Sequence, residues 1–417
     1  MQHKIRDSNL SGQGSLKIEW AESRMPVLMS IRRRFERTKP LKGLRVGGCL
    51  HITKETASLV KTFVAGGAET AWCGCNPLST QDDVAAALVE LGVGVFGWRG
   101  LSTEEYYWCI DQVLDSRPNV TLDDGADLVS VIHEKRSSLI GDVIGGTEET
   151  TTGVNRLRAL AADGRLRYPI VAVNDAQSKN LFDNPIGTGQ SALDGIMRAT
   201  NVLFAGKDVV VVGYGQVGSG IAERARGLGA RVTVVESSPI RALRAAMFGF
   251  KVSSMSSAAE DGDIFITATG NMNAIRGEHM QRMKDKAILA NAGHFDVEIS
   301  KKDLEALSIA RKRVNPCTEE YRLKDGRSLF LLGEGRLVNL ACAEGHPSEV
   351  MDLSFSIQAL SVEYIAKNRG KLPVAVLDVP REIDEEVAGL KLQAMGFDVE
   401  NLTEEQRKYL SSWKMGT

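Results

Sequence analysis

Side chains that could move protons gather in six short polar clusters. Three of them are His51-Ile-Thr53-Lys-Glu55, the pair Asp123-Asp124, and Glu148-Glu149 followed by three threonines. Histidine, lysine and carboxylate groups are the usual general acids and bases. A lysine accepts a proton near neutral pH only when burial or nearby positive charge lowers its pKa from about 10.4. The other clusters begin at Asn174, Asn291 and Asn339, and they carry Lys179, Asp183, Asn184, His294 and His346.

Each cluster taken singly also has a purely structural explanation. His51 fits a buried core histidine, and Asp124 fits a helix cap. Glu149 would be favourable in the first turn of a helix, and Lys179 could simply be solvated. Their presence together with a nucleotide-binding motif is what favours a catalytic role.

That motif is Gly213-Tyr-Gly215-Gln-Val-Gly218, which follows an apolar run and opens a predicted helix. Gly213 allows a tight turn, Gly215 lets the backbone approach a pyrophosphate, and Gly218 permits close packing of helix on strand. The helix N-terminus attracts the phosphates. Glu236 ends the next predicted strand and favours NAD over NADP, because a carboxylate accepts hydrogen bonds from ribose hydroxyls and repels a 2′-phosphate. Arg241 could tolerate a phosphate, but we expect Glu236 to decide.

The elements that must position these clusters alternate between short apolar strands and helices. Such alternation predicts a parallel sheet with helices on both faces and a ligand outside the carboxyl ends of the strands. His51, Asp124 and Asn174 each follow a predicted strand directly. In this first unit strands are expected at 44–50, 70–73, 94–96, 120–122 and 169–173, with a helix at 53–64.

A second doubly wound unit is expected from about residue 190. It comprises helices at 191–203 and from the glycine motif to 228, with strands at 207–212, 231–235, 264–267 and 287–291. A further helix is predicted at 351–366, followed by a charged tail from Pro380. The predicted fold class is therefore α/β, with two doubly wound parallel-sheet (Rossmann-like) domains plus a small C-terminal tail.

Composition narrows the class of protein further. The 417 residues carry a formal net charge of -2, which predicts no attraction to nucleic acid or to membrane surfaces. No apolar run is long enough for a membrane helix and the start does not resemble a signal peptide, so a cytoplasmic location is expected. The six scattered cysteines indicate reduced thiols. Cys73-Gly-Cys75 lacks a second ligand pair, so no metal site is expected.

Eight strings of the sequence together resemble the adenosylhomocysteinase family, most closely its short-tailed archaeal or thermophilic members. They occur in the family's order between Gly48 and Ser348. The strings are GCLHITKET, NPLSTQDD, LDDGADL, EETTTGV, VNDAQSKNLFDN, GYGQVGSG, NAGHFDVEI and EGRLVNLACAEGHPS.

The resemblance implies reversible hydrolysis of S-adenosyl-L-homocysteine to adenosine and L-homocysteine, with one tightly bound NAD per subunit. Oxidation of the 3′-hydroxyl makes the C4′ proton acidic. Homocysteine is then eliminated, water adds, and the ketone is reduced again. The resemblance also implies a homotetramer, and a hinge near 184–189 and 345–348 that closes over the site.

The resemblance assigns roles to individual residues. His51 and Asp124 match the pair near C4′ and C5′, and Lys179 matches the proton acceptor for the 3′-hydroxyl. The implied catalytic residues are His51, Asp124, Glu149, Lys179, Asp183 and Asn184. The implied substrate contacts are Thr53, Glu55, Ser79, His294, His346, Met351 and Phe355. The implied cofactor contacts are Thr150, Thr151, Thr152, Asn184, Gly213, Gly215, Gln216, Val217, Gly218, Glu236, Arg241, Thr269, Gly270, Asn271, Ala292, Gly293, His294, Asn339 and His346.

On this basis we assign residues 1–188 and 346–380 to a substrate-binding domain and residues 189–345 to an NAD-binding domain. Residues 381–417 are assigned to a C-terminal dimerisation or tail segment.

The sequence departs from the family pattern in three places. Thr188 stands where a cysteine is common, and Arg241 replaces an asparagine that often holds the adenosine ribose. The tail is shorter than in many members and lacks their terminal tyrosine, although Lys414 could stand in for the lysine that reaches a neighbouring subunit's NAD. Some archaeal relatives prefer an inosine base, so S-inosyl-L-homocysteine is an alternative substrate. A plain NAD-dependent dehydrogenase and an inactive NAD-binding relative are the remaining alternatives.

Overall fold

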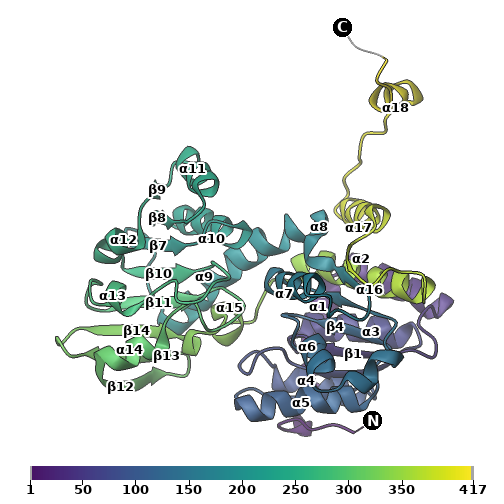
Figure 1. Cartoon of the computed structure of the whole chain (residues 1–417), viewed down its shortest axis with the longest axis horizontal. Helices are drawn as coiled ribbons and strands as arrows, with labels where there is room; N and C mark the ends of the chain where they lie inside the picture. Colours follow the sequence, from purple (N-terminus) through teal and green to yellow (C-terminus); the bar gives the residue numbers. More distant parts are fainter. Residues whose placement is uncertain (1, 415–417) are drawn as a thin grey trace.

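The computed structural model describes residues 2–414 as two α/β halves, each built on one sheet (Figure 1). This confirms the predicted fold class. The chain crosses between the halves near residues 183–188 and again near 345–348. Both crossings therefore fall where the hinge was expected.

The first half contains a seven-stranded parallel sheet in the order β15-β6-β5-β4-β1-β2-β3. Its strands are β1 (Arg45–Cys49), β2 (Glu69–Cys73), β3 (Gly94–Phe96), β4 (Val120–Asp123), β5 (Gly145–Glu148), β6 (Ile170–Ala172) and β15 (Val376–Asp378). Its helices are α1 (Ser11–Ser23), α2 (Pro26–Thr38), α3 (Lys54–Ala65), α4 (Asp82–Glu90), α5 (Thr103–Asp115), α6 (Asp127–Glu134), α7 (Thr151–Ala162), α8 (Gln177–Asn180), α16 (Ser348–Lys367) and α17 (Arg381–Ala394).

The second half contains an eight-stranded sheet in the order β12-β13-β14-β11-β10-β7-β8-β9. Its strands are β7 (Asp208–Val212), β8 (Arg231–Val235), β9 (Lys251–Val252), β10 (Ile264–Thr267), β11 (Ala287–Asn291), β12 (Ser308–Asn315), β13 (Thr318–Leu323) and β14 (Ser328–Leu332). Its helices are α9 (Thr188–Thr200), α10 (Gln216–Gly227), α11 (Pro239–Met247), α12 (Met255–Asp261), α13 (Gly277–Met280), α14 (Lys301–Leu307) and α15 (Val338–Ala341).

The order of the strands determines where ligands can lie. In the first sheet the chain runs outward from β1 through β2 to β3, and the later strands β4 to β6 lie on the other side of β1. In the second sheet β8 and β9 lie on one side of β7, and β10 and β11 lie on the other. Each sheet therefore has a switch point, where neighbouring loops diverge and leave a crevice at the carboxyl ends of the strands.

Several parts of the fold were not anticipated from the sequence. The first sheet contains two strands, β5 and β15, that were not predicted. β13 runs antiparallel to both β12 and β14, so the edge of the second sheet is mixed rather than wholly parallel. α17 lies within the charged segment that we assigned to the tail, yet it packs against the first half and buries Val387. Lys391 Nζ of this helix lies 2.9 Å from Asp352 Oδ2, and Asp352 also accepts the backbone N–H of Leu28 at the start of α2.

Candidate active site

The crevices of the two sheets face each other across one cavity of about 760 Å³. This size is within the usual range for ligand pockets, roughly 300–1,000 Å³. The predicted site residues that line it are His51, Thr53, Glu55, Asp124, Glu149, Thr150, Thr151, Thr152, Lys179, Asp183, Asn184, Gly215, Gln216, Val217, Arg241, Thr269, Gly270, Ala292, Gly293, His294, Asn339, His346, Met351 and Phe355. Five predicted residues lie outside this lining: Ser79, Gly213, Gly218, Glu236 and Asn271.

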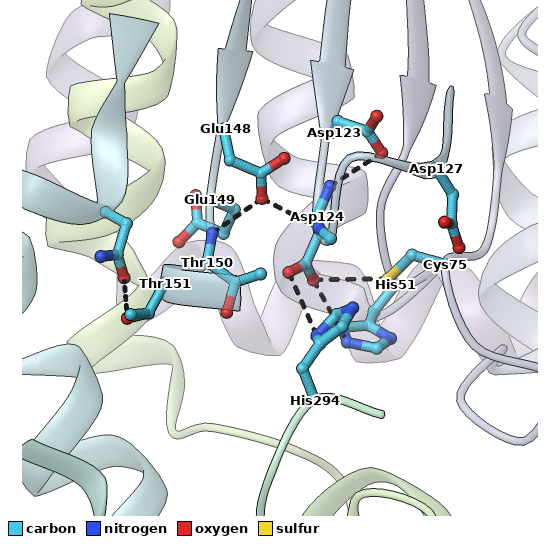
Figure 2. A network of polar contacts seen from close by, with 12 residues as sticks. His51, Cys75, Asp123, Asp124, Asp127, Glu148, Glu149, Thr150, Thr151 and His294 are labelled. Atoms are coloured by element: carbon cyan, nitrogen blue, oxygen red, sulfur yellow. Dashed lines mark hydrogen bonds and ion pairs between the residues drawn. The ribbon is translucent and has the colours of Figure 1, made fainter. Parts of the chain in front are cut away.

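His51 and Asp124 meet at the switch point of the first sheet, because they directly follow the neighbouring strands β1 and β4 (Figure 2). His51 Nε2 lies 3.2 Å from Asp124 Oδ2, and its Nδ1 bonds to Ser79 Oγ at 2.7 Å. Ser79 is therefore placed behind the imidazole. Burial lowers the pKa of His51 to about 4. The Asp124 carboxylate opposes this shift, but repulsion by His294 and His346 cancels part of its effect. The imidazole is thus neutral at pH 7 and can act as a base.

Two further groups contact the Asp124 carboxylate. His294 Nδ1 reaches across from the second half to lie 3.6 Å from Asp124 Oδ1, and the Cys75 thiol donates to Oδ2 at 3.3 Å (Figure 2). His51, Asp124 and His294 offer ligand atoms within 4.8 Å of one another, a spacing that a metal ion could use. The same atoms already pair with each other, so the cluster is explained without a metal.

The buried carboxylate of Glu148 holds two loops of the site together (Figure 2). Its Oε1 accepts the backbone N–H of Gly125 at 2.8 Å and that of Thr150 at 3.0 Å. These amides belong to the loop that carries Asp124 and to the start of α7. Burial raises the pKa of Glu148 well above its ordinary value, with further contributions from Asp123 and Asp124. Glu148 thus acts through the backbone and sets the spacing between the two loops.

Lys179 lies at the centre of a second polar group. Its Nζ donates to Asn184 Oδ1 at 2.9 Å and lies 3.3 Å from Asp183 Oδ1 and 3.7 Å from Glu149 Oε1. Asn174 Oδ1 lies 3.4 Å from the same nitrogen. Glu149 and Asn174 follow the ends of β5 and β6, and the other side chains come from the short helical segments between β6 and α9, so all of them share one edge of the sheet.

The pKa of Lys179 differs from the expectation that it should be lowered. Burial does lower it, but the carboxylates of Asp183 and Glu149 outweigh burial and hold the pKa of Lys179 above its ordinary value. The pKa of Asp183 is lowered, since burial is outweighed by Lys179 and His346. Burial raises the pKa of Glu149 to about 8, with Lys179 opposing it. Glu149 is therefore the carboxyl of this group that binds a proton near neutral pH.

Helix α16 supplies two side chains that were not predicted from the sequence. Gln358 Nε2 donates to Glu149 Oε2 at 2.6 Å, and Ser354 Oγ donates to Asp183 Oδ2 at 2.6 Å. With the predicted Met351 and Phe355 they occupy positions i, i+3, i+4 and i+7, which is one face of a helix. Extending the helical period from Met351 would have found both, because polar residues on an apolar helix face usually have a partner.

The glycine motif of the second half fits a dinucleotide. Gly213 has a φ of +100°, and a Cβ on Gly218 would lie 1.9 Å from the Gly213 carbonyl oxygen. Beside Gly215, in contrast, the nearest described atom to such a Cβ is Arg241 Nη1, at 3.9 Å. The backbone is thus packed tightly behind the turn and open in front of it, which is what close approach of a pyrophosphate needs.

Glu236 ends β8 beside this turn. Its Oε2 accepts the Tyr214 N–H at 2.7 Å, and its Oε1 accepts the Ser238 N–H at 2.8 Å. Burial opposes ionisation, but these backbone hydrogen bonds hold the pKa of Glu236 below its ordinary value. A charged carboxylate at this position accepts hydrogen bonds from ribose hydroxyls and disfavours a phosphate.

Two more features of the second half fit a cofactor. Asn339 donates from Nδ2 to Ser191 Oγ at 3.2 Å, while its buried Oδ1 has no hydrogen-bond partner among residues 2–414. Such an atom usually has a partner, and it lines the cavity, where an amide of a bound ligand could supply one. Glu298 was not anticipated: it accepts the N–H groups of Thr269 and Gly270 and so shapes the loop after β10.

Together, two doubly wound domains, a glycine cradle for a dinucleotide and a proton-transfer group facing it define an NAD-binding α/β enzyme. Residues 184–345 match the family model "S-adenosyl-L-homocysteine hydrolase, NAD binding domain", and residues 2–140 match "S-adenosyl-L-homocysteine hydrolase". The chain belongs to the adenosylhomocysteinase family.

Three curated relatives illustrate the likeness. The chain is 60% identical to the adenosylhomocysteinase of Sulfurisphaera tokodaii over 100% of both chains. It is 58% identical to the adenosylhomocysteinase of Saccharolobus solfataricus, again over 100% of both. It is 57% identical to the S-inosyl-L-homocysteine hydrolase of Methanopyrus kandleri, over 100% of this chain and 98% of that one.

Proposed function

We propose that the chain catalyses the reversible hydrolysis of S-adenosyl-L-homocysteine to adenosine and L-homocysteine, using one tightly bound NAD per subunit. The observation that carries this proposal is that the Lys179 group and the His51–Asp124 pair face the glycine cradle across one cavity. A plain dehydrogenase needs only one proton-transfer group beside its cofactor. Two such groups fit a reaction that oxidises one carbon and cleaves a bond at another.

Bound NAD supplies reversible oxidation of the ribose 3′-hydroxyl. Lys179 accepts the hydroxyl proton, and Asn184 holds its ammonium group at 2.9 Å. Because the Glu149 carboxylate is one of the charges that raise the pKa of Lys179, protonation of Glu149 lowers the pKa of Lys179. The titrations of the two groups are therefore linked, and a proton on Glu149 increases the fraction of Lys179 that is neutral and able to accept the hydroxyl proton.

His51 and Asp124 act at the bond to sulfur. The neutral His51 imidazole takes up and returns the protons of the elimination and of the water addition, while Asp124 orients it from 3.2 Å. The closeness of His294 from the second half indicates that this pair is complete when the two halves approach each other. Such approach also excludes water from the reactive ketone.

We assign the base and amino-acid contacts to the remaining lining residues of the first half and of the crossings between the halves. Glu55 Oε1 accepts the Ser348 hydroxyl at 2.6 Å, and His346 Nε2 bonds with Thr188 Oγ1 at 2.9 Å. The proposed substrate contacts are Thr53, Glu55, His346, Met351 and Phe355, joined by His294 from the second half. Ser79 lies outside the lining, and we propose that it acts through its hydrogen bond to His51. S-inosyl-L-homocysteine is the second candidate substrate, because the chain is nearly as similar to the Methanopyrus kandleri enzyme as to those named for adenosine.

We further propose that the protein is a cytoplasmic homotetramer. Within residues 2–414 no helix is long and apolar enough to cross a membrane. Helix α18 (Glu404–Ser411) projects away from both halves (Figure 1). Leu410 is 71% exposed and Trp413 is 90% exposed, which supports packing of this segment on another subunit. The same proposal includes contact between Lys414 and the NAD of a neighbouring subunit.

The test is release of free thiol from S-adenosyl-L-homocysteine by the purified protein, without added NAD and without net NADH. We expect thiol release, and comparison with the inosine conjugate identifies the preferred base. Absence of thiol from both conjugates would contradict the proposal, and net NADH would favour a dehydrogenase.

A further inference from the structure

Outside the catalytic cavity, two cysteines meet at the boundary between the halves. Cys317 lies in the turn that joins β12 to β13, and Cys342 follows the last residue of α15. The Cys317 thiol donates to the Ala341 carbonyl at 3.3 Å, and Cys342 Sγ lies 3.9 Å from the Cys317 carbonyl oxygen. Cys342 Sγ therefore lies against the backbone of Cys317, and Cys317 Sγ lies against the backbone of Ala341, the residue before Cys342.

The surroundings of this pair set it apart from the other cysteines. Cys317 and Cys342 are partly exposed, whereas Cys49, Cys73, Cys75 and Cys109 are buried. Cys317 also lines a small separate cavity of about 170 Å³ that residues of both halves enclose. Reactive cysteines lie in accessible electropositive sites, while buried ones are inert. The pair therefore has the access that thiol chemistry requires.

Arg99 supplies the positive charge from the other half. It lies in the loop after β3, and its guanidinium donates to the same Ala341 carbonyl that Cys317 contacts. The hydrogen bond from Cys342, together with Arg99, holds the pKa of Cys317 at about 6 against the effect of burial. The pKa of Cys342 is raised by its partner and by burial, so it remains a thiol. Cys317 is thus the sulfur that attacks as a thiolate, and Cys342 is the sulfur that keeps its proton.

We propose that Cys317 and Cys342 form a redox-active dithiol at the domain boundary, with Cys317 as the attacking sulfur and Cys342 as the resolving one. The oxidant is a small peroxide. The Cys317 thiolate attacks one peroxide oxygen and the O–O bond breaks, which gives a sulfenic acid and a hydroxide that takes up a proton to become water. The Cys342 sulfur then attacks the sulfenic sulfur. The disulfide forms and a second water leaves, so both electrons lost by the sulfurs reduce the peroxide.

The position of the pair gives the disulfide a structural consequence. It would tie the β12–β13 turn to the end of α15, the helix that carries Asn339, just before the crossing at residues 345–348. It would also remove the thiolate that faces Arg99. Oxidation would therefore act on the boundary between the halves without altering a residue that lines the catalytic cavity.

The test uses the purified holoenzyme treated with hydrogen peroxide, blocked with an alkylating reagent and digested with trypsin. Cleavage after Arg313, Arg322, Arg336 and Lys367 places the two cysteines in separate peptides, 314–322 and 337–367. We expect these peptides to be joined, and we expect the intact mass before alkylation to be lower by roughly 2 Da per chain for one new disulfide. Cys342→Ser should instead accumulate a trappable sulfenic acid at Cys317, and Cys317→Ser should give neither product. Cys109→Ala, at a buried cysteine, is the matched control and should still give the joined peptides.

The pH dependence of alkylation tests the role of Arg99. We expect the Cys317 alkylation midpoint near pH 6 in the wild type, and a shift toward about 8.5, the value of a free thiol, in Arg99→Gln. The midpoint is a better readout than the rate, because a thiolate of lower pKa is also a weaker nucleophile. Peptides that stay separate in the wild type, or a wild-type midpoint at the value of a free thiol, would overturn the proposal. Both readouts are independent of substrate turnover, so they do not depend on the function proposed above.

Discussion

Both halves of the molecule have a crevice at the switch point of their sheet, but the loops around the two crevices carry different kinds of residue. At the carboxyl edge of the first sheet, the loops after the strands carry titratable side chains such as the half-buried His51 and the buried Asp124 and Glu149. At the switch point of the second sheet, the loop after β7 carries glycines, and the main charged group is Glu236. In the function that we propose, the first half transfers protons through its side chains, and the second half binds the cofactor through its backbone. The first half should therefore be sensitive to changes of charge, and the second to added volume.

The largest effect is expected in the first half, from removal of Lys179. Lys179→Ala should lower the rate of NAD reduction on adding adenosine by roughly 10²–10⁴-fold, the usual contribution of a general base. The measurement is the NADH absorbance in a single turnover. Lys371→Ala, at an exposed lysine, is the matched control. Normal reduction in Lys179→Ala would remove the role assigned to this residue.

The next effect tests the second half through added volume. Gly218→Ala places a Cβ 1.9 Å from the Gly213 carbonyl, so it should both lower the melting temperature and abolish retention of NAD through purification. Gly215→Ala has open space, and it should lose NAD while its melting temperature without cofactor stays near that of the wild type. If both variants retained NAD, the assignment of this turn to the pyrophosphate would be wrong.

A smaller effect is expected from a residue that acts through another. Gln358→Met removes the donor to Glu149 and keeps a similar volume, so kcat should fall about 10–100-fold, the value of one hydrogen bond to a charged group. Because Gln358 lowers the pKa of Glu149, the limb of the pH profile that belongs to Glu149 should move above its value of about 8. A fall in kcat with an unchanged pH profile would indicate a structural role only.

The smallest effect concerns stability in acid. The pKa of His51 is lowered from 6.5 to about 4 in the folded protein, so the unfolded state binds more protons between these values. The contribution of His51 to the free energy of unfolding is therefore fully present above pH 6.5. It is lost as the pH falls from 6.5 through about 4, and the loss is at most about 3 kcal/mol. His51→Gln should lose less unfolding free energy than the wild type over this window, as measured by denaturant titration. The same loss in both proteins would show that His51 is not the group responsible.

Local patterns in the sequence were sufficient for much of this molecule. Four strands have the predicted bounds, namely 94–96, 231–235, 264–267 and 287–291. Each is a short apolar run between turn residues, so neighbouring residues alone indicate where it begins and ends. The glycine turn and Glu236 were predictable for the same reason, since strand, turn and helix follow one another directly. Most of the site residues that the family resemblance implies line one cavity in the structure.

Other features depended on contacts between distant segments. The antiparallel β13 and the packing of α17 were missed, because neither has a local signal that specifies its partner. The pKa of Lys179 was expected to fall and is raised, because two carboxylates oppose the effect of burial.

The sequence by itself determined the α/β class, the dinucleotide turn and the types of side chain available for catalysis, since each is encoded within a few residues. The tertiary structure alone decided which of these side chains touch. Gln358 reaches Glu149 across 209 residues of chain, and Arg99 reaches the backbone beside Cys342 across 242 residues. Such contacts, and the pKa values that follow from them, depend on distance and burial in three dimensions, and no short stretch of sequence encodes either quantity.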